Sequence, residues 1–391
     1  MFVLETICVL LLAVLSLAVG YLYFLALVAV FSRKAFAGVP DDYSFLILVP
    51  AHNEETGITA TLESLSSLEK PGRAQVVVIA DNCTDKTAQL ARQAGVQVLE
   101  RFDEINRGKG FALEWAMSTL NLGEFDAVAI IDADTFVEPG MLTAMASALM
   151  SGHGAVQLNY RFVAAAGEPL SCLQEMASHV ENMLFYRGRA VFNLPILLRG
   201  SGMAIRTEVI RDHPWDSHSI TEDVDYAVNL IRKSVSITFS AESAVDSLAT
   251  STYRQFQGQK KRWASGTILM VREKTLPLLK QGCSQGRLKL IELALSFLLL
   301  SRPAMVYMVL PVIILSLFAS DAYRLILIGW CLGLVLAIVA YLLLGIFYVK
   351  SKWSAVKALL HLPVYIFWYL KVSVRAALDH KQSDWVRTDR K

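Results

Sequence analysis

The stretch Ala127-Val-Ala-Ile-Ile-Asp132-Ala-Asp134 decides the fold class predicted for this chain. A short uninterrupted apolar run indicates a strand that is buried on both faces of a sheet. In open α/β sheets the ligand crevice lies at the carboxyl ends of the strands, where these two aspartates fall. Alternate residues of a strand point to the same side, so Asp132 and Asp134 can reach one site. Paired carboxylates beside a diphosphate suit Mg²⁺ or Mn²⁺, although a polar turn without function also explains an isolated Asp-x-Asp.

Two further apolar runs predict neighbouring strands that end on polar residues. Residues 45–49 lead into Pro50-Ala-His-Asn-Glu-Glu55, and residues 76–80 lead into Asp81. The segments between and after them alternate in character, with helical patterns at 57–68, 84–94 and 110–120 and a strand at 96–99. This alternation predicts a mostly parallel sheet with right-handed crossovers. Polar groups follow three of these strands, around Asn53, Asp81 and Asp132. The ordinary polarity of surface loops explains one such strand end more easily than three.

The following hundred residues contain three weaker signals. Residues 155–160 fit a strand, and 170–192 fit a long amphipathic helix in which His179 is expected to be packed or solvated. Gly200-Ser-Gly-Met-Ala204 is either a tight turn or a place where backbone approaches a ligand. Thr221-Glu-Asp223 opens an apolar-periodic helix, and capping alone would explain its acidic pair. The basic, aromatic stretch from Tyr253 onward fits a surface-lying amphipathic helix.

The flanking segments are too apolar for an ordinary soluble protein. The chain is 54% hydrophobic and 18% charged, and residues 2–31 carry one charge, Glu5. This segment is long enough to span a bilayer, and a cleaved signal peptide is the alternative. Residues 290–320 and 325–349 predict two more spans. Residues 361–377 are shorter and more charged, which favours an interfacial helix over a fourth span.

Basic residues set the predicted orientation of these spans. Arg33-Lys34 and the cluster of Lys350, Lys352 and Lys357 should lie inside, with residues 321–324 as an outer loop. The domains are then a transmembrane helix at 1–39, a cytoplasmic α/β domain at 40–275, two spans with an interfacial helix at 276–380, and a tail at 381–391. A transporter would need charges facing a pore within the spans, and only Glu5, Glu292 and Arg302 qualify.

The overall charge and the cysteines exclude other classes. A net charge of +2 gives no case for nucleic-acid binding. The five cysteines, at 8, 83, 172, 283 and 331, are scattered, with neither metal-ligand spacing nor a disulfide framework. We expect them to be reduced.

The sequence contains a set of motifs in a fixed order. It comprises Pro50-Ala-His-Asn-Glu-Glu55, Asp81, Asp132-Ala-Asp134, Gly200-Ser-Gly202, Thr221-Glu-Asp223 and Gln259-x-x-Arg262-Trp263. In this order the chain resembles the membrane-bound family 2 glycosyltransferases, the group with cellulose, chitin, hyaluronan and poly-N-acetylglucosamine synthases. The resemblance covers about residues 40–275 and the pattern of flanking helices. It implies a GT-A fold, which is Rossmann-like, and an inverting, metal-dependent transfer of a hexose or N-acetylhexosamine.

The resemblance also implies a role for each motif residue. Asp223 would be the catalytic base that takes the acceptor proton, with Glu222 beside it in the catalytic pair. Asp132 and Asp134 would hold the metal, and Gly200, Ser201 and Trp263 would form the acceptor site. The nucleotide sugar would contact Ala51, His52, Asn53, Glu54, Asp81, Lys109, Asp132, Gln259 and Arg262. In the tail, Thr388 and Arg390 resemble a gating segment that closes over the nucleotide, and a disordered tail near anionic lipid is the alternative.

The substrates follow from the resemblance only in outline. The donor would be a UDP-sugar, and the acceptor a growing polysaccharide or a lipid-linked glycan at the cytoplasmic face of the inner membrane, in contact with membrane lipid. Two departures leave the acceptor open, because Arg199 precedes the Gly-Ser-Gly turn where some synthases have Cys, and Lys260 replaces a frequent Arg. A non-catalytic scaffold that binds nucleotide sugar in a polysaccharide export complex, and a nucleotidyltransferase, are the competing interpretations.

Overall fold

The apolar runs around Asp132 form adjacent strands of one eight-stranded sheet. The computed structural model describes residues 2–31, 36, 38–39, 41–165, 167–250, 252–299 and 302–378. The strand order is β3-β2-β1-β4-β7-β6-β8-β5. The strands are β1 (Phe45–Ala51), β2 (Ala74–Asp81), β3 (Gln97–Arg101), β4 (Ala127–Ile130), β5 (Thr135–Val137), β6 (Ala155–Val163), β7 (Met203–Arg206) and β8 (Ile237–Leu248).

The predicted α/β class is confirmed, and the sheet is mixed, with parallel pairing among four strands at one end and also between β6 and β8. Strands β3, β2, β1 and β4 are all parallel, so their carboxyl ends lie along one edge. Strand β7 runs antiparallel to both β4 and β6, and β5 runs antiparallel to β8. Because β7 is reversed, the Gly200–Gly202 turn before it enters the sheet at the same edge as Asp132.

Helices cover both faces of the sheet, as strands apolar on both faces require. Alternate residues of β1 divide between two cores, with Leu46 and Leu48 in one and Phe45, Ile47 and Val49 in the other. The helices of this domain are α2 (Ile58–Ser66), α3 (Thr87–Gln93), α4 (Lys109–Thr119), η1 (Leu122–Glu124), α5 (Met141–Met150), α6 (Pro169–His179), η2 (Val180–Tyr186), α7 (Arg187–Val191), α8 (Thr207–Asp212) and α9 (Glu222–Arg232). Residues of α2 and α5 belong to the second core, and residues of α4 and α9 to the first.

The long helix predicted at 170–192 is interrupted in its middle. Between α6 and α7 the chain forms the π-helix η2. Asn182 in this π-helix is fully buried, and its side-chain amide donates to the Tyr160 carbonyl at 2.5 Å. π-Helical turns within α-helices occur frequently at functional sites. His179 is buried and stacks on Tyr348, so of the two expected environments, packed or solvated, it has the packed one.

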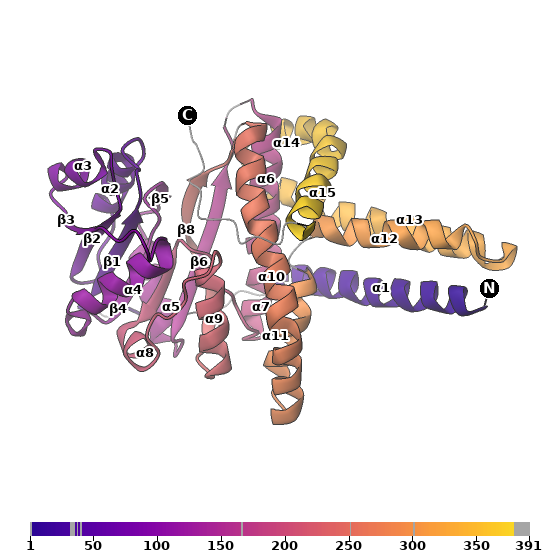
Figure 1. The fold of residues 1–391 in the computed structure, drawn as a ribbon, viewed down its shortest axis with the longest axis horizontal. Helices are drawn as coiled ribbons and strands as arrows, with labels where there is room; N and C mark the ends of the chain where they lie inside the picture. Colours follow the sequence, from indigo (N-terminus) through magenta and orange to yellow (C-terminus); the bar gives the residue numbers. More distant parts are fainter. Residues whose placement is uncertain are drawn as a thin grey trace.

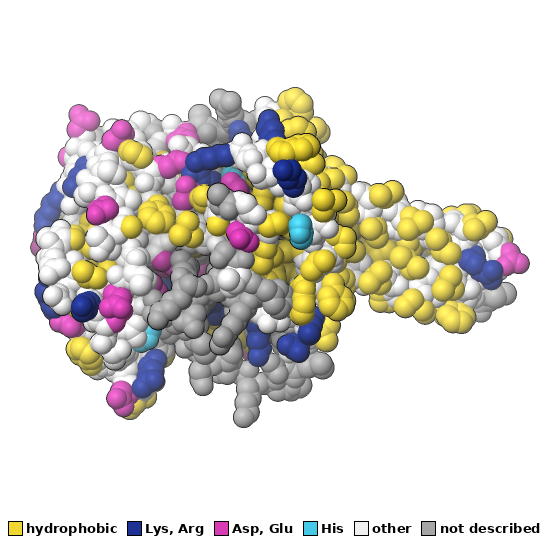
Figure 2. Space-filling view, turned by 90° about the horizontal axis from the view of Figure 1, so that it is seen from above, with side chains coloured by type: hydrophobic (Ala, Val, Ile, Leu, Met, Phe, Trp, Pro, Cys, Tyr) yellow, Lys and Arg dark blue, Asp and Glu magenta, His cyan; other side chains and the backbone are white. Residues whose placement is uncertain are grey.

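Three helices project together from the sheet domain (Figure 1). They are α1 (Phe2–Phe31), α12 (Arg302–Ser316) and α13 (Asp321–Leu343), and they pack against one another. Figure 2 shows that this projection is covered with hydrophobic side chains, whereas the surface of the sheet domain is mixed. By length and composition, three segments of the described chain are long and apolar enough to cross a membrane: Phe2–Phe31, Asp321–Phe347 and Lys352–Arg375.

Over the span predicted at 290–320, the described residues form more than one helical element. These are α11 (Leu288–Ser296), the 3₁₀ turn η3 (Phe297–Leu299) and α12, and α11 packs against α10 (Tyr253–Gln285). The membrane span in this region stays a prediction. Helix α12 has 15 residues and is therefore about 22 Å long, less than the hydrocarbon thickness of a bilayer. After α13 come η4 (Leu344–Phe347), α14 (Lys352–Ala358), η5 (Leu359–His361) and α15 (Leu362–Leu378). Helix α15 lies across the base of the projection in Figure 1, and its placement at the membrane interface stays a prediction.

A buried ion pair joins the projection to the domain. The Arg189 guanidinium on α7 donates two hydrogen bonds to the Glu292 carboxylate on α11, at 2.6 and 2.7 Å. Arg189 is 1% exposed, and the Tyr21 hydroxyl on α1 donates to the same carboxylate at 2.7 Å. Beside it, a Cβ on Gly188 would lie 2.3 Å from the Leu25 carbonyl oxygen, so only glycine lets α7 approach α1 this closely. Glu292 therefore serves as an interhelical anchor and does not have the pore-facing role that a transporter would need.

Candidate functional site

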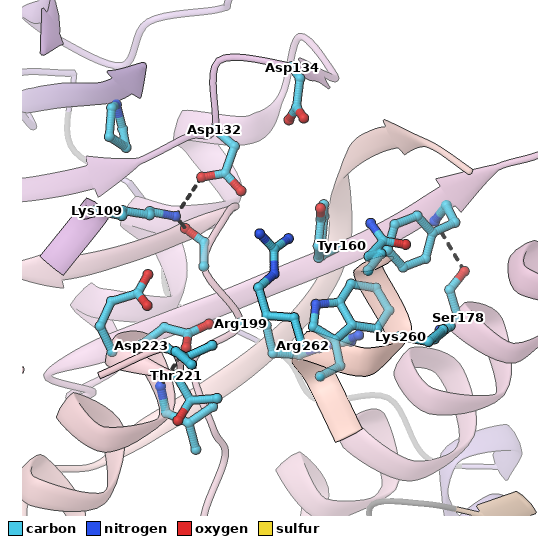
Figure 3. A pocket seen from close by; sticks show the side chains of 18 of the residues that line it. Lys109, Asp132, Asp134, Tyr160, Ser178, Arg199, Thr221, Asp223, Lys260 and Arg262 are labelled. Carbon is cyan, nitrogen blue, oxygen red and sulfur yellow. Dashed lines mark hydrogen bonds and ion pairs between the residues drawn. The ribbon is translucent and has the colours of Figure 1, made fainter. Parts of the chain in front are cut away.

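The strand ends border a cavity of about 1290 Å³. It is bounded by the carboxyl ends of β1, β2 and β4, the turn before β7, the start of α9 and one side of α10 (Figure 3). Motifs from separate parts of the chain meet in its lining, which contains Ala51, His52, Asn53, Glu54, Asp81, Lys109, Asp132, Asp134, Gly200, Glu222, Asp223, Gln259, Arg262 and Trp263. Among the predicted site residues that the structure describes, all except Ser201 line this one cavity.

The loops after β1 and β2 are joined to each other at one end of this cavity. A ring nitrogen of His52, Nδ1, lies 2.7 Å from the Asp81 carbonyl oxygen, and the Thr84 amide donates to Asn53 Oδ1 at 2.7 Å. Asn53 is in the left-handed region at φ 56°, which asparagine tolerates better than most residues. These contacts hold the predicted nucleotide loop in one conformation.

Asp81 is held by an arginine that the sequence analysis missed. The Arg101 guanidinium pairs with the Asp81 carboxylate at 2.7 Å, and both side chains are less than a tenth exposed. Arg101 is the last residue of β3 and lies opposite Asp81 in the parallel register. Aligning the two predicted neighbouring strands in parallel register would have placed Arg101 beside Asp81.

Lys109 connects the metal motif to the glycine turn. It is the first residue of α4, and its ammonium donates to Asp132 Oδ1 and to the Gly200 carbonyl, the latter at 2.7 Å. Burial opposes the charge of Lys109, but Asp132, Glu222 and Asp223 outweigh this effect and raise its pKa. The lysine therefore places a fixed positive charge beside the aspartates.

Asp132 and Asp134 supply the oxygen ligands that Mg²⁺ or Mn²⁺ prefers. Within the described residues no group of three His, Cys, Asp or Glu side chains gathers around a possible metal position. Mg²⁺ commonly binds through one or two carboxylates together with substrate phosphates and water. The two aspartates therefore fit a metal that is held jointly with a diphosphate, and this role stays a prediction.

The acidic pair at the start of α9 faces the same space. Thr221 occupies the N-cap position without a side-chain capping hydrogen bond, whereas Asp223 Oδ1 accepts a hydrogen bond from the Val224 amide at 2.8 Å in the first turn. Burial by the cavity walls raises the pKa of Glu222, and the neighbouring Asp223 charge raises it further. Burial also raises the pKa of Asp223, against the opposing effect of Lys109. Carboxyl groups with raised pKa in a cleft are candidates for acid–base chemistry.

Gly200 marks the point where these groups converge. Its φ is +79°, and a Cβ there would lie 3.3 Å from Asp223 Oδ2, 3.4 Å from Lys109 Nζ and 3.9 Å from Asp132 Oδ2. A side chain at this position would fill the space between Asp223, Lys109 and Asp132. Glycine leaves that space open for a substrate.

Ser201 does not line the cavity, in contrast to its predicted acceptor role. Its side chain is fully buried, and its hydroxyl accepts a hydrogen bond from the Asp132 amide at 3.0 Å. The residue is flanked by Gly200 and Gly202, both with positive φ, in the turn that leads into β7. Ser201 therefore positions Asp132 from behind.

Helix α10 forms the opposite wall and is not a helix that merely lies on the surface. Gln259 is 5% exposed, and its side-chain oxygen is buried without a hydrogen-bond partner among the described residues. The Lys260 ammonium lies 4.2 Å from the centroid of the Trp263 ring, so one indole face contacts a cation. Lys260 and Arg199, noted from the sequence only as departures, both line the cavity.

Two parts of the predicted machinery lie outside the described residues. These are the tail with Thr388 and Arg390, and the Arg33-Lys34 pair used to orient the first span.

The comparison with known proteins agrees with this geometry. Residues 40–266 match the family described as Glycosyltransferase like family 2. The chain is 31% identical over 228 residues to the β-monoglucosyldiacylglycerol synthase of Nostoc sp., covering 56% of this chain and 48% of that protein. It is 26% identical over 241 residues to the probable glycosyltransferase YdaM of Bacillus subtilis, covering 58% and 55%. The chain spans about half the length of these curated relatives.

A solved structure resembles nearly the whole chain. The mannosyltransferase PcManGT from Pyrobaculum calidifontis, in complex with GDP-Man and Mn²⁺, has a TM-score of 0.59 at 17% identity, covering 97% of this chain and 100% of that chain. This likeness confirms the predicted GT-A fold with its flanking helices. With the family match over more than half of the residues, it follows that this chain belongs to glycosyltransferase family 2.

Proposed function

We propose that the protein is an inverting, metal-dependent glycosyltransferase that moves a hexose or N-acetylhexosamine from a nucleotide sugar to a membrane-bound acceptor. The nucleotide that we propose for the donor is UDP. The observation that carries this proposal is the meeting of Asp132, Lys109 and Asp223 around Gly200. One cavity thereby holds the predicted metal ligands, a fixed cation and a carboxylate with a raised pKa.

The roles follow from what the reaction needs. The acceptor oxygen attacks the anomeric carbon while the bond from that carbon to the diphosphate breaks, and the nucleoside diphosphate leaves. Asp223 accepts the proton of an attacking hydroxyl. Lys109 and Arg262 offset the negative charge that develops on the leaving diphosphate. A metal bound at Asp132 and Asp134 would supply further charge stabilisation there.

Donor hydrolysis by the purified full chain tests the proposal. Each nucleotide sugar of a UDP- and GDP-linked panel is incubated with and without Mn²⁺, and free nucleoside diphosphate is measured. We expect turnover of one donor that depends on the metal. Donor binding without turnover under every condition, with and without membrane lipid, would contradict the proposal and favour the non-catalytic scaffold.

We further propose that the cavity faces the cytoplasm and that residues 321–324 lie outside the cell membrane. In a Cys283→Ser background, which removes the exposed native thiol, an Ala322→Cys variant should react with an impermeant thiol reagent in intact cells. A Lys352→Cys variant, at a second exposed position, should react only after the cells are permeabilised. The reverse labelling pattern would invert the orientation.

A further inference from the structure

The cavity continues well beyond the metal motif. Figure 3 shows Asp132, Lys109 and Asp223 towards one side of the pocket, and Tyr160 and Lys260 towards the other. On the first side the lining is rich in carboxylates, which suits a metal and a nucleotide. The second side includes Trp263 of the Gln259-x-x-Arg262-Trp263 motif, but the predicted motifs assign no role to Lys260 or Arg199 there.

The second side holds two cations, Arg199 and Lys260, that form no close ion pair. Neither lies within 4.0 Å of a carboxylate oxygen in the described chain, although Glu181, which lines the same cavity, acts on Lys260 from farther away. The Lys260 ammonium contacts aromatic faces, 4.2 Å from the Trp263 ring centroid and 5.7 Å from that of Phe256. Charges removed from water are normally paired, so two partly buried cations lining one cavity suit an anionic ligand.

Arg199 is held in place by neutral groups. Its guanidinium donates to the side-chain oxygen of Asn182, which the π-helix η2 buries completely behind the cavity wall. It also lies over the rings of Tyr186 and Tyr160, at 5.5 and 6.0 Å from their centroids. These contacts orient the guanidinium without neutralising it, which leaves its charge available to a ligand.

Beyond these cations the wall of the cavity is apolar. It is formed by Leu342 and Leu343 at the end of α13, by Leu362 and Tyr365 on α15, and by Leu173 and Met176 on α6. Helices α13 and α15 belong to segments that are apolar enough to cross a membrane. A ligand that reaches the cations from this side would therefore pass along a membrane-facing apolar surface.

We infer that the acceptor is a membrane lipid with a phosphate in its head group, which Arg199 and Lys260 bind while the lipid chains lie along α13 and α15. This inference rests on the proposed function, since it identifies the acceptor class of the same site. The parts of such a lipid match successive regions of the cavity. The accepting oxygen would lie at Asp223, the phosphate at the two cations, and the hydrocarbon chains against the leucines.

The electrostatics of the cation pair agree with this arrangement. Burial and the nearby positive charge of Arg199 lower the pKa of Lys260 to about 7, against the opposing effect of Glu181. A phosphate beside the two cations would stabilise the charged form of Lys260 and raise its pKa. A neutral lipid such as diacylglycerol would leave the two positive charges facing each other.

Binding of lipid to the full chain is the first test, and it requires no donor. Purified protein is titrated with phosphatidylglycerol and with diacylglycerol, and bound lipid is measured by native mass spectrometry. We expect a phosphate lipid to bind more tightly than diacylglycerol, and Lys260→Gln to weaken that binding about 10- to 100-fold. Lys260→Arg, which keeps the charge, should retain most of it. The control is Lys357→Gln, which removes an exposed cation on α14 outside the cavity.

Equal losses in Lys260→Gln and Lys357→Gln would overturn the inference, because they would indicate general attraction to anionic lipid. Tighter binding of diacylglycerol would also overturn it.

Transfer assays then separate this inference from the proposed function. With the donor that is hydrolysed, we expect transfer to a phosphate lipid, with the KM for lipid raised in Lys260→Gln much more than the KM for donor. Equal use of glycerol 3-phosphate, a soluble source of the same phosphate, would exclude the lipid. If no donor reacts but phosphate lipid still binds through Lys260, the proposed function fails and the lipid site stands.

Discussion

Replacing Asp223 with asparagine is expected to lower turnover by about 10²- to 10⁴-fold while nucleotide-sugar affinity changes little, the usual effect of losing a general base. The carboxylate lies beside Gly200, where the acceptor and donor would meet. Asparagine keeps the shape of the side chain but accepts no proton. Because burial raises the pKa of Asp223, turnover of the native enzyme should increase with pH over a range above that of an ordinary aspartate.

Asp225→Asn is the matched control for this variant. It removes the same charge from the same helical turn, but Asp225 pairs with Lys274 and does not line the cavity. We expect it to keep native turnover within a few-fold. Steady-state kinetics and equilibrium binding of the donor measure both variants. A parallel loss of donor affinity in Asp223→Asn would assign this carboxylate to donor or metal binding.

Asp134→Asn should abolish metal-dependent turnover and should weaken Mn²⁺ binding in the presence of nucleoside diphosphate. The effect should exceed that of Asp132→Asn, because one oxygen of Asp132 is already hydrogen-bonded to Lys109. Asp134 lies in the turn between β4 and β5, where its side chain is partly exposed and contributes little packing. The fold should therefore survive the change.

Titration of Mn²⁺ by electron paramagnetic resonance measures this binding directly. Asp126→Asn is a suitable control, since Asp126 lies at the opposite end of β4 and contacts Ser44. Thermal unfolding of each variant checks that the fold is retained. Native turnover and unchanged Mn²⁺ affinity in Asp134→Asn would remove this motif from the metal site.

The half of the sheet that carries the site could be predicted from the sequence because each of its strands is marked by a local pattern of residues. Each buried strand reads as an apolar run, and parallel strands bring their polar ends to one edge. The convergence of Asn53, Asp81 and Asp132 followed from these two facts. The direction of β7 did not, because a four-residue strand after a glycine turn carries no signal of its own orientation.

Other differences arose where tertiary packing overrides local pattern. The apolar run at 290–320 reads as one helix, but its first part forms α11 and η3, and α11 packs against α10. Ser201 is a polar residue between two glycines, which suggests an exposed side chain, yet the turn directs it behind Asp132. Lys260 stands in a basic stretch that suits solvent, and only the fold shows that it lines a cavity.

The ion pair between Arg189 and Glu292 has a consequence for biosynthesis and for protein production. Arg189 is buried in the complete fold, but its carboxylate partner is translated about a hundred residues later, and Tyr21 was translated long before. A nascent domain that ends before α11 holds this guanidinium without its counter-charge. Where the site stays covered, leaving one partner of a buried pair alone costs about 3–5 kcal/mol, a large share of the stability of a typical domain. A fragment trimmed to the sheet domain for solubility also lacks Glu292, so we expect a fragment that extends through α11 to be the more stable one.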